Sequence, residues 1–537
     1  MTTRRPTTRD FADFLRHSNQ FENLQYFEKT LTEEERDAMS ASYFSNCELD
    51  WNQLEEKVNN ALAAKSLTDS FYTKRQLVFS SEAISNPALN IFDKRSSLAF
   101  KWNELGLESL IRGECAVCIL AGGQATRLNQ GSTTPKGCFV IPYLPSQKSL
   151  FQILVEKVQK AEIMAFEHHQ RCPGKIISYP RIPVLILTSE ENNEETKNFF
   201  RKHELFGLQE CQLFFLTQPM LPVFRFESMK SLHPLSFIFK SQTEVAFAPS
   251  GNGAFYSALA VSGLSKHLRD IGVRYIQICP VDNPLVNIAD TAFLGLCIQE
   301  KIDVGCKGFS VPIEDFNKNA GVFCADFASS TSKVNWSILE YSELDENLLA
   351  RHGKRERHDG YVIANMAVHC LSLSFCDQVW NSQNKLSRQA YSESTSMYHI
   401  AKKNIPTCQL KEGVVEGIKL ESFIFDEFHQ AEKLGILIVD KASEFSPIKR
   451  ADSPLSDIKD FGKVPEGTPL AARLAILRND LRQLPFGSLR DMNKLSIDMD
   501  ALSFEIDPMV PILLPTEMLR LGLTKHDSET QEEIPKK

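Results

Sequence analysis

The fold is decided by residues 119–136, which read ILAGGQATRLNQGSTTPK. An apolar run from Ala116 to Leu120 leads into the pair Gly122-Gly123, and Arg127 and Lys136 flank the polar, turn-rich segment that follows. Glycines let the backbone approach a ligand and present N–H groups to an anion, and two cations beyond them can neutralise a polyphosphate. The stretch therefore predicts a strand that ends in a phosphate-binding loop.

Two common phosphate-binding patterns do not match this stretch. A P-loop needs Gly-Lys-Ser/Thr after its glycines, and that triplet is missing at the required spacing. The dinucleotide-binding pattern Gly-x-Gly-x-x-Gly is not reproduced after Gly122-Gly123 either. A nicotinamide-dependent dehydrogenase is therefore a distant alternative, since the acidic residue expected about 20 positions later is missing as well.

From Glu114 onwards, short apolar segments alternate with amphipathic helices, which is typical of a parallel α/β sheet. Asp282 lies just past one of the expected strands. Open α/β sheets bind ligands outside the carboxyl ends of their strands, so Asp282 and the glycine loop (residues 121–136) are predicted to share one site. We expect strands at 116–120, 184–187 and 275–279, and helices that begin at Leu150 and extend over 253–272 and 469–484.

The chain is expected to contain three domains. Residues 1–112 read as mostly helical, with a capping box at Thr32-x-x-Glu35. Residues 113–430 form the expected catalytic domain, a mixed and mostly parallel sheet with flanking helices. Residues 431–537 form a small α+β domain with a polar tail.

Composition narrows the classes of function. The net charge of −8 and the lack of a basic block argue against a nucleic-acid partner. No apolar run approaches the roughly 20 residues that span a bilayer, and the first residues lack the apolar core of a secretion signal. We therefore expect a protein without membrane contact. We also expect it to be a monomer or a weak dimer.

The 13 cysteines are scattered along the chain, which indicates reduced thiols and a cytoplasmic location. Cys115 and Cys118 lie three positions apart in the first expected strand, so their side chains should face opposite sides of the sheet. No second pair follows at the spacing of a zinc site, and we interpret both thiols as buried apolar groups.

The glycine loop resembles the signature of the nucleotidyltransferases that make nucleotide sugars, and further motifs narrow the resemblance. Their order is that of the eukaryotic UDP-N-acetylhexosamine pyrophosphorylases, and the resemblance runs from about residue 100 to about residue 485. It implies a Rossmann-like nucleotidyltransferase core. The motifs are Phe247-Ala-Pro-Ser-Gly-Asn-Gly253, Val281-Asp-Asn283, Leu339-Glu-Tyr-Ser-Glu343 and Ser446-Pro-Ile-Lys449.

The resemblance implies the reaction of UTP with N-acetylglucosamine 1-phosphate, which gives UDP-N-acetylglucosamine and pyrophosphate. The sugar phosphate attacks the α-phosphorus of UTP in line, so the protein must supply positive charge and alignment more than an acid or a base. The implied catalytic cations are Arg127, Lys136 and Lys449. Asp282 is implied to contact the nucleotide and to hold Mg²⁺, for which Mn²⁺ can substitute.

The resemblance also assigns residues to the two ends of the nucleotide sugar. The family enzymes carry Gly-Asn-Gly where related UDP-glucose enzymes carry Gly-His-Gly, and this chain has Gly251-Asn252-Gly253. Two of the implied sugar-binding residues, Phe423 and Phe425, alternate at strand spacing and should face one side together. The implied nucleotide-binding residues are Leu120, Ala121, Gly122, Gly123, Gln218 and Gly251, and the implied sugar-binding residues are Asn252, Glu340, Asn365, Lys419, Phe423 and Phe425.

The glycine loop departs from the family pattern in three ways. Ala125 and Asn129 each replace a glycine, and two extra residues separate Arg127 from Pro135-Lys136. Because alanine tolerates positive φ poorly, we expect the loop to turn differently at Ala125 and to be a longer, open lid without substrate.

Two alternative functions stay open. One is the same reaction on glucose or galactose 1-phosphate, and the other is a weakly active sensor of nucleotide sugars.

Overall fold

The computed structural model places most of the chain, although several segments, including Arg127 and Asn129 of the glycine loop, lie outside the described residues. The described residues are 7–18, 20–46, 54–55, 57–59, 61, 76–77, 90–123, 125, 128, 134–142, 144–170, 178–225, 236–312, 320–326, 335–340, 361–388, 398–409, 413–453 and 464–482.

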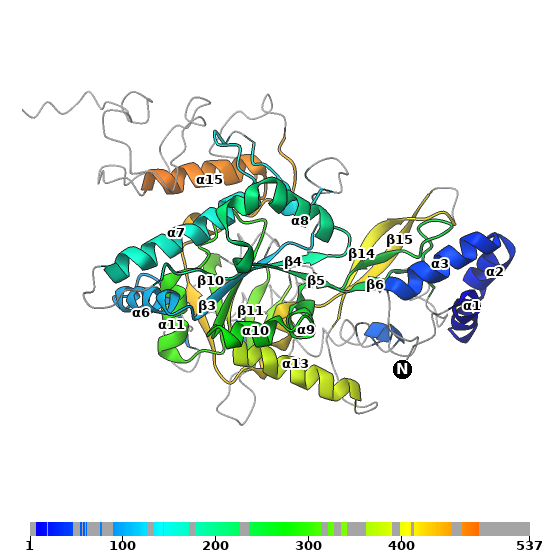
Figure 1. The fold of residues 1–537 in the computed structure, drawn as a ribbon, viewed down its shortest axis with the longest axis horizontal. Helices are drawn as coiled ribbons and strands as arrows, with labels where there is room; N and C mark the ends of the chain where they lie inside the picture. The colour runs from blue at the N-terminus through cyan, green and yellow to red at the C-terminus, as the bar shows by residue number, and fades with distance from the viewer. Residues whose placement is uncertain are drawn as a thin grey trace, which may run out of the picture.

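A large mixed sheet forms the centre of the molecule (Figure 1). Its main path is β2-β16-β10-β13-β9-β3-β4-β5, and β11, β12 and β1 extend it from β13. Strands β9, β3, β4 and β5 are parallel to one another, β2, β16 and β10 form a second parallel group, and β13 is antiparallel to both β10 and β9. The predicted mixed, mostly parallel sheet is confirmed. The strands are β1 Gln76–Leu77, β2 Ile91–Asp93, β3 Cys115–Leu120, β4 Val184–Ser189, β5 Leu213–Gln218, β9 Tyr275–Pro280, β10 Val304–Pro312, β11 Val322–Asp326, β12 Asn335–Leu339, β13 Tyr361–Ser372 and β16 Leu434–Ile438.

The central strands are apolar because helices cover both faces of the sheet (Figure 1). One face packs against α6, α7 and α11, and the opposite face packs against α9, α10 and α13. Cys115 belongs to the first core and Cys118 to the second, which confirms their predicted opposite orientation. The helices of the core are α6 Ala99–Ile111, α7 Leu150–Gln170, α8 Asn193–Lys202, α9 Phe255–Val261, α10 Leu264–Asp270, α11 Thr291–Glu300 and α13 Leu373–Arg388, with 3-10 turns η2 Lys136–Cys138, η3 Glu204–Gly207, η4 Glu210–Gln212, η6 Asn252–Ala254 and η7 Ile424–Gln430.

The single helix predicted over 253–272 is wrong. The segment forms the turn η6 and two short helices, α9 and α10, which are separated at Gly263. Gly263 has φ 74°, a left-handed conformation that a residue without Cβ adopts at little cost. The apolar periodicity continues through the break, because both helices pack against the same face of the sheet.

The N-terminal helices lie beside two small sheets at one end of the central sheet (Figure 1). The capping box is confirmed: the Glu35 N–H donates to Thr32 Oγ1 at 3.3 Å, and the Thr32 N–H donates to Glu35 Oε2 at 2.8 Å. These elements are α1 Thr8–His17, α2 Phe21–Lys29 and α3 Glu33–Asn46, with the sheet β14-β15-β7 (His399–Pro406, Val414–Glu421, Phe224–Arg225) and the pair β6-β8 (Met220–Pro222, Phe247–Pro249).

The central sheet includes strands from outside the expected catalytic domain. β2 precedes residue 113 and β16 follows residue 430, and the helix α6 that packs on the sheet also precedes residue 113. After β16 come α14 (Lys441–Glu444) and α15 (Pro469–Arg482), and α15 begins at the proline predicted for its first turn. Lys449 lies between these two helices, so the chain returns to the catalytic sheet before it reaches this lysine.

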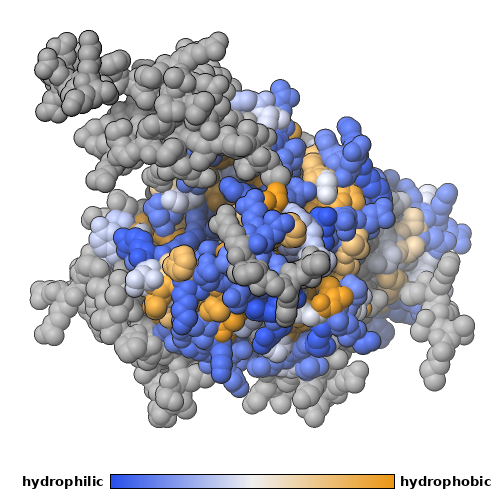
Figure 2. Space-filling view, turned by 60° about the vertical axis from the view of Figure 1, so that its left-hand side comes forward, coloured by the Kyte–Doolittle hydropathy of each residue, from blue (hydrophilic) through white to orange (hydrophobic). Residues whose placement is uncertain are grey.

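The visible face in Figure 2 is largely hydrophilic, with apolar residues in small scattered patches. Among the described residues, no helix combines the length and the apolar character needed to cross a membrane.

Candidate active site

The carboxyl ends of four parallel strands bring the predicted residues to one edge of the sheet. β3 leads into the glycine loop, β9 into Asp282, and β5 ends at Gln218. Their registers pair Leu120 with Pro280 on one side and with Leu187 on the other. The sequence-based placement of the glycine loop beside Asp282 is therefore confirmed.

Asp282 is the centre of a group of three charges. Its Oδ2 atom accepts from Lys136 Nζ at 2.9 Å and lies 3.0 Å from Lys449 Nζ. Lys136 begins the turn η2 after the glycine loop, whereas Lys449 comes from the segment between α14 and α15. Segments more than 300 positions apart thus place two cations on one carboxylate oxygen.

The Asp282 carboxylate is buried, with a side chain only 9% exposed. Burial by itself raises the pKa of this carboxyl, but the Lys136 and Lys449 ammonium groups outweigh burial and hold the pKa well below its usual range. Asp282 is therefore ionised at neutral pH. Its second oxygen, Oδ1, is buried and has no hydrogen-bond partner among the described residues.

The glycine loop meets Gln218 at Gly122. A Cβ atom on Gly122 would lie 1.8 Å from Gln218 Nε2, so only glycine allows this close approach. The Leu120 carbonyl accepts from the Val281 N–H at 3.1 Å and the Ala121 N–H donates to Leu187 at 2.8 Å. Within the described part of the chain, the N–H groups of Gly122 and Gly123 have no partner, which leaves them available to a ligand.

The glycine loop accommodates Ala125 without a left-handed backbone conformation. Ala125 is absent from the described residues with positive φ, and so are Gly122 and Gly123. Ala125 is buried, its N–H donates to the Thr134 carbonyl at 3.0 Å, and its carbonyl accepts from the Leu128 N–H at 2.8 Å. Alanine fits this position because the loop turns without a left-handed residue there.

The Gly-Asn-Gly motif is joined to the segment after β15. Gly251 has φ 95°, and its missing Cβ leaves room for the Ser422 carbonyl. The Gly253 N–H donates to that carbonyl at 2.9 Å, and Asn252 Oδ1 accepts from the Ile424 N–H at 2.9 Å. The side-chain oxygen of Asn252 thus caps the start of η7.

Phe423 and Phe425 come together as predicted, but through a turn. Their rings stack with centroids 5.0 Å apart, beside the His399 ring. The strand spacing on which we based this prediction is wrong, because β15 ends at Glu421 and Phe425 lies in η7. The pair adjoins Asn252 through the hydrogen bond at Ile424.

Glu340 and Asn365 both approach Gly321. The Asn365 N–H donates to the Gly321 carbonyl at 2.8 Å, and Glu340 Oε1 lies 3.5 Å from the position of a Cβ on Gly321. Asn365 Oδ1 accepts from the N–H of Ala367, which has φ 57°, so this side chain also stabilises a bulge in β13. The remaining sugar candidate, Lys419 on β15, is ion-paired with Glu421.

Residues 73–469 match the sequence family of the UTP–glucose-1-phosphate uridylyltransferases. The chain belongs to this family. It is similar to UDP-N-acetylglucosamine diphosphorylase 1 of Arabidopsis thaliana, with 33% identity over 378 residues, 70% of this chain and 67% of the relative. It is also similar to a probable UDP-N-acetylglucosamine pyrophosphorylase of Dictyostelium discoideum, with 33% identity over 68% of this chain and 72% of that relative.

The fold of the uridylyltransferase is similar to a crystal structure of the Trypanosoma brucei uridine diphosphate N-acetylglucosamine pyrophosphorylase in complex with an inhibitor. The TM-score is 0.68, with 26% identity, and the match covers 89% of this chain and 86% of that chain. The predicted resemblance to the eukaryotic UDP-N-acetylglucosamine pyrophosphorylases is confirmed by these relatives.

Sequence reasoning missed polar residues that support the uridylyltransferase site. Asn192 is fully buried, and its Nδ2 donates to the Ala121 carbonyl at 2.9 Å, so it fixes the start of the glycine loop. Asn283 is equally buried beside Asp282 and bonds to the segment that carries Lys449. Asn283 stood in a quoted motif, but nothing in its spacing indicated a partner more than 150 positions away.

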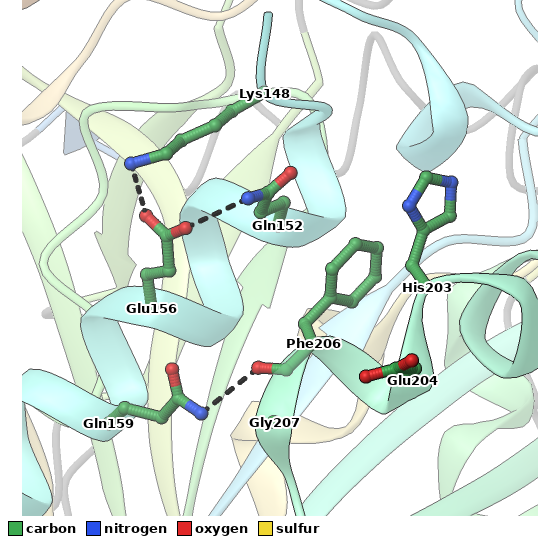
Figure 3. A pocket seen from close by; sticks show the side chains of 8 residues that line it. All are labelled: Lys148, Gln152, Glu156, Gln159, His203, Glu204, Phe206 and Gly207. Carbon is green, nitrogen blue, oxygen red and sulfur yellow. Dashed lines mark hydrogen bonds and ion pairs between the residues drawn. The ribbon is translucent and has the colours of Figure 1, made fainter. Parts of the chain in front are cut away.

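The uridylyltransferase has a further hollow of about 510 Å³ between α7 and η3 (Figure 3). Several of its polar groups already have partners: Lys148 lies 2.9 Å from Glu156, and Gln159 donates to the Phe206 carbonyl at 3.0 Å. None of the residues predicted to bind substrate lines it, so this hollow is separate from the group around Asp282. It is lined by Lys148, Gln152, Glu156, Gln159, His203, Glu204, Phe206 and Gly207.

Proposed function

We propose that the chain catalyses the reaction of UTP with N-acetylglucosamine 1-phosphate to give UDP-N-acetylglucosamine and pyrophosphate. The observation that carries the proposal is the buried Asp282 carboxylate with Lys136 and Lys449 on one oxygen. It lies beside the glycine loop, where the N–H groups of Gly122 and Gly123 have no partner among the described residues. Such a group suits a reaction between two anions, in which charge must be neutralised and held in place. The similar proteins of Arabidopsis thaliana, Dictyostelium discoideum and Trypanosoma brucei are all named for UDP-N-acetylglucosamine, which supports the choice of sugar.

In this mechanism the two lysines change partners when substrate binds. Without substrate both ammonium groups neutralise Asp282, and incoming phosphate oxygens compete for them. Lys136, at the end of the glycine loop, is placed to hold the phosphates that leave as pyrophosphate. Lys449 approaches from the C-terminal segment and is placed to neutralise charge on the reacting phosphates. We assign Arg127 the same role as Lys136, as the family resemblance implies.

The uracil end and the sugar end of the nucleotide sugar are assigned to residues near the two glycine motifs, Gly122-Gly123 and Gly251-Asn252-Gly253. We propose that Gln218 and the Gly122 N–H bind the uracil edge, with Gly251 close by, because the Ser250 N–H donates to the Pro219 carbonyl at 3.0 Å. The Asn252 NH₂ group and the Phe423–Phe425 pair then form one side of the sugar site. Glu340 and Asn365 form another side of the sugar site. The stacked rings of Phe423 and Phe425 suit contact with the methyl group of the N-acetyl substituent.

A magnesium ion fits the donor set at Asp282. The buried Oδ1 atom has no partner among the described residues, and a carboxylate oxygen is a ligand that Mg²⁺ prefers. No group of three His, Cys, Asp or Glu side chains suited to a metal occurs in the described ranges, but Mg²⁺ often uses a single carboxylate with substrate phosphates. When bound, the ion neutralises phosphate charge, and Mn²⁺ can substitute for it.

The direct test is pyrophosphate release from UTP and Mg²⁺ with a panel of sugar phosphates. We expect N-acetylglucosamine 1-phosphate to give the highest kcat/KM among the N-acetylglucosamine, N-acetylgalactosamine, glucose and galactose 1-phosphates. Highest turnover with glucose or galactose 1-phosphate would replace this sugar assignment with the alternative. An inactive wild type that still binds UDP-N-acetylglucosamine would favour the sensor.

Two variants test the charge arrangement. Lys136→Ala and Lys449→Ala should each lower kcat by about 100-fold or more, since each removes a cation that stabilises the transition state. Lys433→Ala is the matched control, because this half-buried lysine pairs with Glu300 far from Asp282. Equal activity of the two site variants and the control would refute the role given to the lysines.

A further inference from the structure

The segment that carries Lys449 is tied to the Asp282 loop by three hydrogen bonds. The Ile448 N–H donates to the Asp282 carbonyl at 2.8 Å. Asn283 makes the other two bonds: its Oδ1 accepts from the Ser446 N–H at 3.0 Å, and its Nδ2 donates to the Glu444 carbonyl at 2.7 Å. One fully buried side chain therefore bridges the residue after Asp282 and the backbone that leads to Lys449.

Glu444 is held from its other side by a buried group of four charges. Its carboxylate lies 2.6 Å from both Lys94 and Lys307, and both lysines also pair with Asp290, at 2.8 and 2.5 Å. Two positive and two negative charges balance, as burial requires. We call Lys94, Lys307, Asp290 and Glu444 the charge quartet.

The other members of the charge quartet lie on or directly beside strands and a helix of the core. Lys307 lies on β10 and is completely buried, and Asp290 caps α11 by accepting from the N–H groups of Ala292 and Phe293. Lys94 follows β2 directly. Glu444, the last residue of the short helix α14, is thus fixed to the sheet just before the chain turns towards Lys449.

The Asp282 loop is fixed separately from the side of α7. Lys157 Nζ donates to the Pro284 carbonyl at 2.6 Å and to the Val286 carbonyl at 3.0 Å. Asn283 therefore joins two parts that are each anchored elsewhere. Lys449 itself is half exposed, so its ammonium depends on the backbone of its segment for its position.

We propose that Asn283 is a positioning residue that keeps Lys449 within reach of the reacting phosphates, with Glu444 of the charge quartet as its anchor. The inference rests on the proposed function, because it assigns a purpose to the position of Lys449. Asn283 acts through the backbone at Glu444 and Ser446, and its own side chain does not touch substrate.

The test compares Asn283→Ala with Asn23→Ala. Asn23 is a matched control, since it is also fully buried and donates to a backbone carbonyl, that of Phe237, at 3.0 Å in the N-terminal region. Both variants should lower the melting temperature. Only Asn283→Ala should lower kcat, by about tenfold to 100-fold with little change in KM for UTP, because misplacement of a catalytic group has effects of this size.

A double-variant cycle separates positioning from general destabilisation. In a Lys449→Ala background, Asn283→Ala should cause no further loss of kcat, because its effect acts through Lys449. Full loss in both backgrounds would overturn the proposal. If Asn283→Ala does not fold, Lys94→Met loosens Glu444 more mildly, since Lys307 still pairs with it, and the same cycle applies to this variant.

Hydrogen exchange provides a readout that does not depend on activity. The amides of Ser446, Ile448 and Lys449 should exchange faster in Asn283→Ala than in wild type, and at the wild-type rate in Asn23→Ala. Unchanged exchange would overturn the positioning role of Asn283. Faster exchange in a protein that releases no pyrophosphate would instead overturn the proposed function, while the link from Asn283 to the segment of Lys449 would stand.

Discussion

Gly122→Ala is expected to weaken UTP binding through Gln218. The new Cβ would lie 1.8 Å from Gln218 Nε2 and 2.9 Å from its Cδ. An ordinary contact begins near 3.4 Å, so the Gln218 amide must retreat by 3.4 − 1.8 = 1.6 Å. Because Gln218 is buried, this movement takes the amide out of the position in which we propose that it binds the uracil edge.

The size of the effect follows from the contacts involved. A neutral hydrogen bond contributes about 0.5–1.5 kcal/mol, so its loss should raise KM for UTP by about twofold to tenfold. The clash involves the end of a flexible side chain and not backbone, so the loss of stability should be at the low end of overpacking, about 1 kcal/mol. We therefore expect a variant that folds and turns over, but needs more UTP.

The assay is steady-state pyrophosphate release at varied UTP concentration, for Gly122→Ala, Gln218→Ala and the double variant. In the Gln218→Ala background the clash is gone, so Gly122→Ala should add little. Gly123→Ala should raise KM less than Gly122→Ala, because no atom of a described residue lies within 4 Å of its Cβ position. Unchanged KM in Gly122→Ala, or full additivity with Gln218→Ala, would refute the reasoning.

Three further outcomes are expected. Ala125→Gly should lower the free energy of unfolding by about 0.5–1 kcal/mol without improving kcat or KM, because Ala125 does not need positive φ; a gain in kcat would contradict this. Burial lowers the pKa of His369 from 6.5 to about 3. The unfolded chain thus binds a proton that the folded protein excludes, and the free energy of unfolding should fall by about 1.4 kcal/mol per pH unit below pH 6.5. Urea titrations at pH 7.5 and 5.5 measure this fall, which His369→Phe should reduce. Asp282→Asn should abolish the stimulation of pyrophosphate release by Mg²⁺, and wild-type stimulation would contradict the metal assignment.

The parts of the site that lie at the ends of strands could be predicted from the sequence, because they depend on patterns of neighbouring residues. A short apolar run followed by Gly122-Gly123 indicates a buried strand and a close backbone approach, and β3 and its loop follow that pattern. Asp282 follows β9 for the same reason, and parallel strands deliver both to one edge. These inferences need only the pattern of apolar residues and glycines and the rule that parallel strands end at one edge of a sheet.

The remaining features depend on contacts between distant segments. The spacing of apolar residues in 253–272 does not reveal the break at Gly263, which has φ 74°. The spacing continues across the break because α9 and α10 both pack against the same face of the sheet. Phe423 and Phe425 are two positions apart in either a strand or a turn. The turn is held by hydrogen bonds between Phe423 and Asp426 and by the one from the Ile424 N–H to Asn252. Arg127 lies outside the described residues, so its role stays a prediction.

The position of Lys449 links phosphate binding to the completion of the fold. Lys136 and Asp282 lie beyond the carboxyl ends of the parallel strands β3 and β9, whereas Lys449 comes from the segment that follows β16, which pairs with β10, and Glu444 of the charge quartet. With both lysines present the group around Asp282 has two positive charges and one negative charge, so its surplus is positive and favours anions. Without Lys449 the remaining pair is neutral, and the attraction for a triphosphate falls. The uridylyltransferase site therefore gains its charge only when the C-terminal segment is docked on the sheet.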